Sequence, residues 1–143
     1  MILSAQQLFS DDQAVTATAV STNVIDLRVP GTPFGGNQLN QDIGKGTPIP
    51  LLVQVTEDFN TLTSLTVTVE VSAAAAMTSP VVLATETILL ADLVAGKQMF
   101  NQVVPNGADL RYLGVRYTVT GSAPTLGKIT AGISMGNQTN ITG

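Results

Sequence analysis

The residues with the greatest chemical potential in this chain are two adjacent pairs of acids, Asp11-Asp12 and Glu57-Asp58. Two carboxylates can cooperate in glycoside hydrolysis when they face each other about 5–9.5 Å apart. Neighbouring residues of an extended segment point to opposite sides, so neither pair is predicted to have this arrangement. Oxygen ligands also suit Ca²⁺, but the EF-hand spacing is missing. We therefore interpret both pairs as solvated acids in turns.

The absent residue types exclude further chemistry. The chain has no histidine and no cysteine, which excludes Ser-His-Asp and Cys-His catalysis, imidazole or thiolate metal sites, and disulfides. The segment Gly44-Lys45-Gly46-Thr47 is similar to the end of a phosphate-binding loop, but Gly46 stands where Ser or Thr should follow the lysine. We predict a protein that is not an enzyme and that binds no cofactor and no metal.

The charge of the chain argues against nucleic acid as a partner. The net charge is −4 with six basic residues, and phosphate binding requires clustered Lys and Arg. Arg111 and Arg116 are an odd number of residues apart, so they point to opposite faces of a regular strand. Only 11% of the residues are charged, which suits a surface that contacts other proteins or simply reflects threonine in strands.

No membrane segment or secretory signal is expected. The apolar stretch at residues 80–95 is interrupted by polar residues and is too short to cross a bilayer. The first twelve residues lack a basic region followed by a sustained apolar core. We therefore expect that the protein is not exported from the compartment where it is made.

Alternation of apolar and polar residues predicts an all-β fold. The clearest example is residues 64–72, where Leu65, Val67 and Val69 share one face. The candidate strands are residues 13–19, 22–28, 49–57, 64–72, 81–90, 98–104, 110–120 and 126–135. About eight strands with little helix favour one antiparallel two-sheet β-sandwich over residues 1–143, with an immunoglobulin-like sandwich as an alternative topology.

Residues 110–135 also predict a strand pairing. If residues 121–125 form a loop, Tyr117 lies opposite Ile129 and Leu113 lies opposite Ile133. The apolar faces of the two strands then coincide, whereas a slip of one residue would separate them. We predict a β-hairpin here, with Tyr117 in the core and its hydroxyl bonded to a partner.

Five segments, in the same order along the chain, are similar to a known family. They are FSDDQAVTATA (9–19), STNVIDL (21–27), ILLADLVAGK (88–97), RYLGVRYTV (111–119) and GKITAG (127–132). This set of strand and turn patterns resembles the capsid cement, or decoration, proteins of tailed bacteriophages. The resemblance implies a sandwich of jelly-roll type.

The resemblance also implies a function. A cement protein binds the outside of an assembled capsid and clamps neighbouring subunits of the major capsid protein. The expected location is therefore the capsid surface of the virion, after synthesis in the cytoplasm of the host bacterium. The resemblance further implies a homo-oligomer, either a dimer or a trimer. A tail or receptor-binding accessory sandwich and a carbohydrate-binding module remain alternatives. The second needs exposed aromatic platforms, and the chain has no tryptophan.

The long Pro- and Gly-rich segment at residues 30–50 is a candidate contact loop, because loops of this length are commonly functional. Phe34, Leu39 and Ile43 are its apolar side chains. The alternative is an Ω-loop packed on its own sandwich, with Phe34 in the core.

Two further contact regions are predicted. Residues 1–12 form a possible N-terminal arm that carries Leu3, Leu8 and Phe9, or else an edge strand of the same domain. Tyr112 and Arg116 share the polar face of a strand and form a candidate contact patch. Alternatively, Tyr112 packs across strands beneath Arg116.

Overall fold

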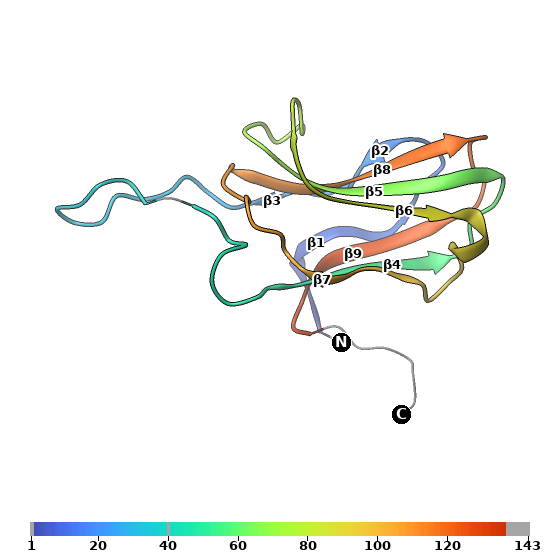
Figure 1. Ribbon diagram of the computed structural model, residues 1–143, viewed down its shortest axis with the longest axis horizontal. Helices are drawn as coiled ribbons and strands as arrows, with labels where there is room; N and C mark the ends of the chain where they lie inside the picture. Colours follow the sequence, from blue (N-terminus) through green and yellow to red (C-terminus); the bar gives the residue numbers. More distant parts are fainter. Residues whose placement is uncertain (1, 40, 137–143) are drawn as a thin grey trace.

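The computed structural model describes residues 2–39 and 41–136, which form two antiparallel β-sheets facing each other (Figure 1). The first sheet contains, in spatial order, β1 (Leu3–Ala14), β9 (Lys128–Ser134), β4 (Pro50–Glu57) and β7 (Gln98–Val103). The second contains β2 (Ala19–Val20), β8 (Tyr112–Gly121), β5 (Leu62–Ser72) and β6 (Val81–Leu89), and β3 (Ile25–Asp26) also pairs with β8.

The strand order is that of a jelly roll. β2 and β3 are short strands that both pair with β8, so together they occupy one edge position of the second sheet. The two four-strand orders are then β1-β9-β4-β7 and β2-β8-β5-β6. The chain changes sheets six times, after β1, β3, β4, β6, β7 and β8, as two Greek keys require. The predicted all-β sandwich is confirmed, and the topology is the jelly roll rather than the immunoglobulin-like alternative.

The core lies between the sheets and is built by alternation. Leu65, Val67, Val69 and Val71 of β5 are fully buried, while Thr66 and Thr68 point outward. Each buried Val or Leu contributes about 1.5–3 kcal/mol of transfer free energy. A 3₁₀ helix, η1 (Leu90–Asp92), follows β6. Within the two described ranges, no helix has the length and hydropathy needed to span a bilayer.

The predicted hairpin at residues 110–135 is wrong, because β8 and β9 belong to different sheets. Tyr117 pairs with Val67 of β5, and Ile129 pairs with Val55 of β4. The loop between β8 and β9 crosses from one sheet to the other instead of folding back within one sheet. The apolar faces of β8 and β9 still meet, but they do so across the core between the two sheets. Alternation therefore predicted the buried face correctly and the partner strand incorrectly.

The predicted strands near the N-terminus are also displaced. β1 already begins at Leu3, so residues 3–12 form an edge strand on β9 rather than an arm that leaves the domain. The reason is burial: Phe9 and Ser10 are both fully buried. Between Leu3 and Leu8 the register with β9 shifts, and the intervening residues are exposed. Such a bulge weakens the edge as a template for pairing with another chain.

Candidate protein-contact surface

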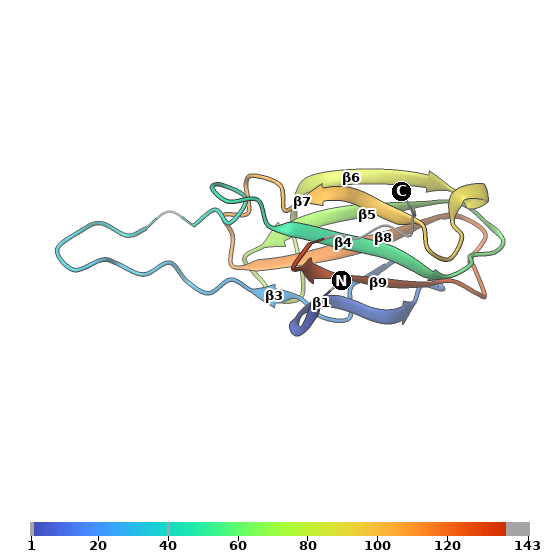
Figure 2. The ribbon, with the colours of Figure 1, turned by 90° about the horizontal axis from the view of Figure 1, so that it is seen from below.

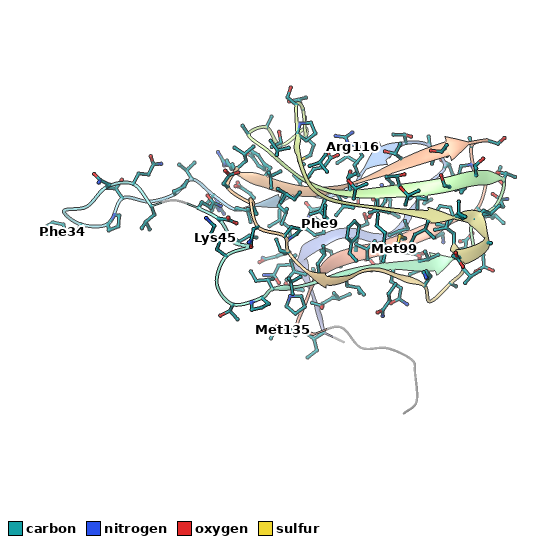
Figure 3. All side chains as sticks on the ribbon, in the orientation of Figure 1. Phe9, Phe34, Lys45, Met99, Arg116 and Met135 are labelled. Atoms are coloured by element: carbon teal, nitrogen blue, oxygen red, sulfur yellow. The ribbon has the colours of Figure 1, made fainter. Side chains whose placement is uncertain are left out.

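A long finger projects from one end of the sandwich, between β3 and β4 (Figures 1 and 2). We use "finger" for residues 28–39 and Gln41. Its tip is a β-turn in which the Gly36 N–H donates to the Pro33 carbonyl at 3.0 Å. Gly35 has φ +70°, a value that glycine adopts without strain. The turn holds Phe34 at the extreme end of the molecule, with its side chain fully exposed (Figure 3).

The finger exposes large apolar side chains and is almost free of charge. Val29 is 64% exposed and Leu39 is 57% exposed. Arg28 is the one charged residue in its sequence. A neutral apolar surface can be buried against another protein at a small desolvation cost. Because Phe34 is fully exposed, the Ω-loop alternative, with Phe34 in the core, is wrong.

The predicted contact residues outside the finger are mostly used inside the fold. Phe9 is a core residue, and Leu3 and Leu8 are half-buried. A Cβ placed on Gly132 would lie 2.9 Å from a methyl carbon of Leu8, so Leu8 packs directly on the backbone of β9. Ile43 is half-buried against the core. Phe9 is thus a wrong prediction, because the strand that carries it turns the ring inward.

Arg116 is bonded within the protein. Its Nε donates to both carboxylate oxygens of Glu70 at 3.0 Å, and its Nη2 donates to the Met77 carbonyl at 3.2 Å. The Glu70 side chain is only 4% exposed, and the chain after β5 reaches the same ion pair through the Met77 carbonyl. Gly114 leaves room for this cover, since a Cβ there would lie 3.2 Å from the Met77 methyl.

Tyr112 lies apart from this ion pair and contacts Arg111 instead. The Arg111 guanidinium carbon lies 5.0 Å from the centre of the Tyr112 ring. The same guanidinium donates two bonds to Asp26, at 3.0 and 2.9 Å. Arg111 thereby lowers the pKa of Asp26 to about 2. Tyr112 and Arg116 each have a partner in the fold, so the structure does not join them into one contact patch.

One acid of each pair binds a lysine of the first sheet. Lys128 of β9 lies between Asp12 of β1 and Glu57 of β4, at 3.1 and 3.4 Å from their carboxylates. Hydrogen bonds from the Thr56 hydroxyl and from Lys128 lower the pKa of Asp12. Asp58 accepts a bond from the Ala95 N–H at 2.6 Å. Their expected position in turns is wrong for the acids within β1 and β4. Among the described residues no acids cluster as a metal site would require.

Sequence reasoning missed several exposed apolar residues at the sheet edges. β6 and β7 are edge strands and lie along the same side of the sandwich (Figure 2). The exposed apolar side chains on them are Val81, Val82, Leu89 and Val103. Local sequence gave no signal of this exposure, because an edge strand and a central strand can share the same alternation.

The family comparison agrees with the extent of the sandwich. The family model described as Bbp16 matches residues 9–133, from β1 to β9. The match covers both sheets and the finger. No curated protein matches the chain. The chain therefore belongs to the Bbp16 family.

Proposed function

We propose that this member of the Bbp16 family is a non-enzymatic structural protein of a phage virion that binds the outside of the assembled capsid. In this proposal it clamps neighbouring subunits of the major capsid protein, as a cement protein does. The observation that carries the proposal is Phe34, a fully exposed aromatic side chain at the tip of a finger that carries a single charged residue. The sequence resemblance to capsid cement proteins supports the same proposal.

The finger is suited to reach a second protein. Aromatic side chains that fill a pocket commonly supply much of the binding energy of an interface. Full burial of a Phe side chain contributes about 1.5–3 kcal/mol. The sandwich behind the finger would rest on one capsid subunit while Phe34 reaches its neighbour. A ligand that binds only the assembled shell stabilises it by RT ln(1 + [L]/Kd), about 2.7 kcal/mol per site at a hundredfold excess over Kd.

The aromatic inventory supports protein contact over carbohydrate binding. Sugar platforms need several exposed rings, whereas Phe9, Phe59 and Tyr117 are buried and the chain has no tryptophan. Val81, Val82 and Val103 are exposed on β6 and β7, and in this proposal a second copy of the chain covers them to form a homo-oligomer. Sedimentation velocity over a range of concentrations would measure that assembly.

The test is co-sedimentation with cement-free capsids of the cognate phage, with unassembled capsid protein as a control. We expect saturable binding to shells only. Phe34→Ala should weaken binding about tenfold or more, equivalent to about 1.4 kcal/mol, without lowering Tm. The matched control is Leu126→Ala, because Leu126 is also exposed (52%) but lies in the loop between β8 and β9 at the opposite end.

Two results would contradict the proposal in different ways. If Phe34→Ala binds shells as tightly as the parent protein, the finger tip is not part of the interface. No binding of the folded parent protein to shells would reject the cement role and direct the search to tail components and glycans.

A further inference from the structure

The returning limb of the finger is fastened at its base by one carboxylate, that of Asp42. Asp42 follows the finger directly, and its side chain is 13% exposed. Its Oδ1 accepts the N–H groups of Gly44, Gly107 and Ala108 at 3.1, 3.1 and 3.2 Å, and its Oδ2 accepts the Gly107 N–H at 3.0 Å. Lys45 Nζ lies 3.8 Å from Oδ2. These N–H bonds lower the pKa of Asp42, so the carboxylate is charged at neutral pH.

The backbone beside Asp42 packs closely against residues 105–106, in the connection between β7 and β8. A Cβ on Gly44 would overlap the Pro105 carbonyl oxygen, so only glycine allows this approach. Further along, the Val104 N–H donates to the Ile49 carbonyl at 2.9 Å. The chain that returns from the finger is therefore attached to the connection between β7 and β8.

The outgoing limb of the finger is attached to that same connection. The Leu27 N–H donates to the Arg111 carbonyl at 2.7 Å. Asp26 accepts the Arg28 N–H at 2.8 Å and binds the Arg111 guanidinium. Both limbs thus rest on residues 107–111, one through Asp26 and one through Asp42. This segment leads directly into β8, a central strand of its sheet.

In the described part of the finger, few hydrogen bonds join the two limbs. The Leu39 N–H donates to the Gly31 carbonyl at 3.0 Å, the Gln38 side-chain amide donates to the Pro30 carbonyl at 3.5 Å, and the Gln41 side-chain amide donates to the Leu27 carbonyl at 3.0 Å. None of these bonds reaches the sandwich core. The direction of the finger relative to the sheets must therefore be set mainly at its base.

We propose that Asp42 is a positioning residue that latches the finger to residues 107–108 and thereby fixes the direction in which Phe34 is presented. The consequence for shell binding rests on the proposed function, whereas the latch itself does not. An interface that requires one finger direction binds in proportion to the population of that direction. If release of the latch leaves the bound direction populated about one tenth of the time, the apparent Kd rises about tenfold.

The direction of the finger can be measured without a capsid. The chain contains no cysteine, so Thr32→Cys in the finger and Thr87→Cys on β6 give two unique sites for spin labels. Both side chains are exposed. Double electron–electron resonance should give one narrow distance distribution for the parent and a broad one after Asp42→Ala. Asp42→Asn, which replaces an acceptor oxygen by a donor facing Gly107, should broaden it as well.

Asp109→Ala is the matched control. Asp109 lines the same concavity at the base of the finger, but its carboxylate takes no part in the bonds from Gly107 and Ala108 to Asp42. Its distribution should match that of the parent.

An unchanged distribution in both folded Asp42 variants would overturn the latch. A broadened distribution with undiminished shell affinity would overturn its role in presenting Phe34. If the parent itself does not bind shells, the proposed function fails while the distance measurement still decides the latch.

Discussion

The hydroxyl groups of Tyr117 and Ser10 lie in one buried hydrogen-bond chain, and we predict that their removal has unequal costs. The two oxygens are 2.8 Å apart, and Ser10 Oγ donates to Gln13 Oε1 at 2.6 Å. Because a serine hydroxyl has one hydrogen, Ser10 must accept from Tyr117. The chain joins β8 of one sheet to β1 of the other. The predicted partner for the Tyr117 hydroxyl is thus confirmed.

The asymmetry follows from what each substitution leaves behind. Tyr117→Phe removes a donor but leaves the Ser10 hydroxyl bonded to Gln13, so we expect a loss of about 0.5–1.5 kcal/mol. Ser10→Ala leaves the fully buried phenol without an acceptor, which costs about 1–3 kcal/mol. The double variant leaves no orphaned phenol, so its cost should fall below the sum of the singles by about 1 kcal/mol.

Urea unfolding followed by far-UV circular dichroism measures these differences, provided that all four proteins share one m-value. A pH series adds an independent readout. Burial raises the pKa of Tyr117 above its usual range, against the opposing effect of the Ser10 bond. The folded-state pKa exceeds the unfolded value of about 10, so stability should decline as the pH rises above 10. Tyr117→Phe should reduce this decline, and Lys128, whose pKa is raised by Asp12 and Glu57, accounts for part of what remains.

Two results would refute the reasoning. If Tyr117→Phe costs as much as Ser10→Ala, the donor assignment is wrong. If the costs of the two single variants simply add, the two side chains do not act as one chain in solution.

Two further predictions concern backbone and charge. Gly127→Ala should lower the free energy of unfolding by about 2 kcal/mol or more, because Gly127 has φ +126° and a Cβ would overlap the Phe59 ring. The control is Gly46→Ala, at φ +96° with open space around it, which should lower the free energy of unfolding by only about 1 kcal/mol. Urea unfolding measures both differences. The Arg111 guanidinium holds the pKa of Asp26 at about 2, below the unfolded value of about 3.9, so the stabilisation is present above pH 4 and is lost as the pH falls toward 2. Asp26→Asn should flatten Tm against pH in that window, and an unchanged slope would contradict the role of the pair.

Much of the fold could be predicted because alternation is a local property. Leu65, Val67 and Val69 are buried as predicted, and the strand limits near β4 to β9 agree within a few residues. The pairing of β8 could not be predicted in the same way. Alternation shows which face of a strand is buried. It does not show whether the next strand of the chain lies beside it in the same sheet or opposite it in the other sheet.

The candidate site was predicted in part. Phe34 and Leu39 are exposed on a projecting loop, as a Pro- and Gly-rich segment with apolar residues suggested. Phe9 looked equally available in the sequence but is buried, because β1 adds to the edge of β9. Whether a residue is exposed depends on which remote segments cover it, and no local sequence pattern contains that information.

The sequence by itself determined the class of this protein: an all-β chain whose lack of histidine and cysteine excludes imidazole and thiolate chemistry. Those properties depend on residue type and on the two-residue period of the extended backbone. Only the tertiary structure decided that β8 and β9 lie in opposite sheets, and that Asp42 meets the N–H groups of Gly107 and Ala108. These contacts join residues far apart in the chain, and they exist only after the loops have crossed between the sheets.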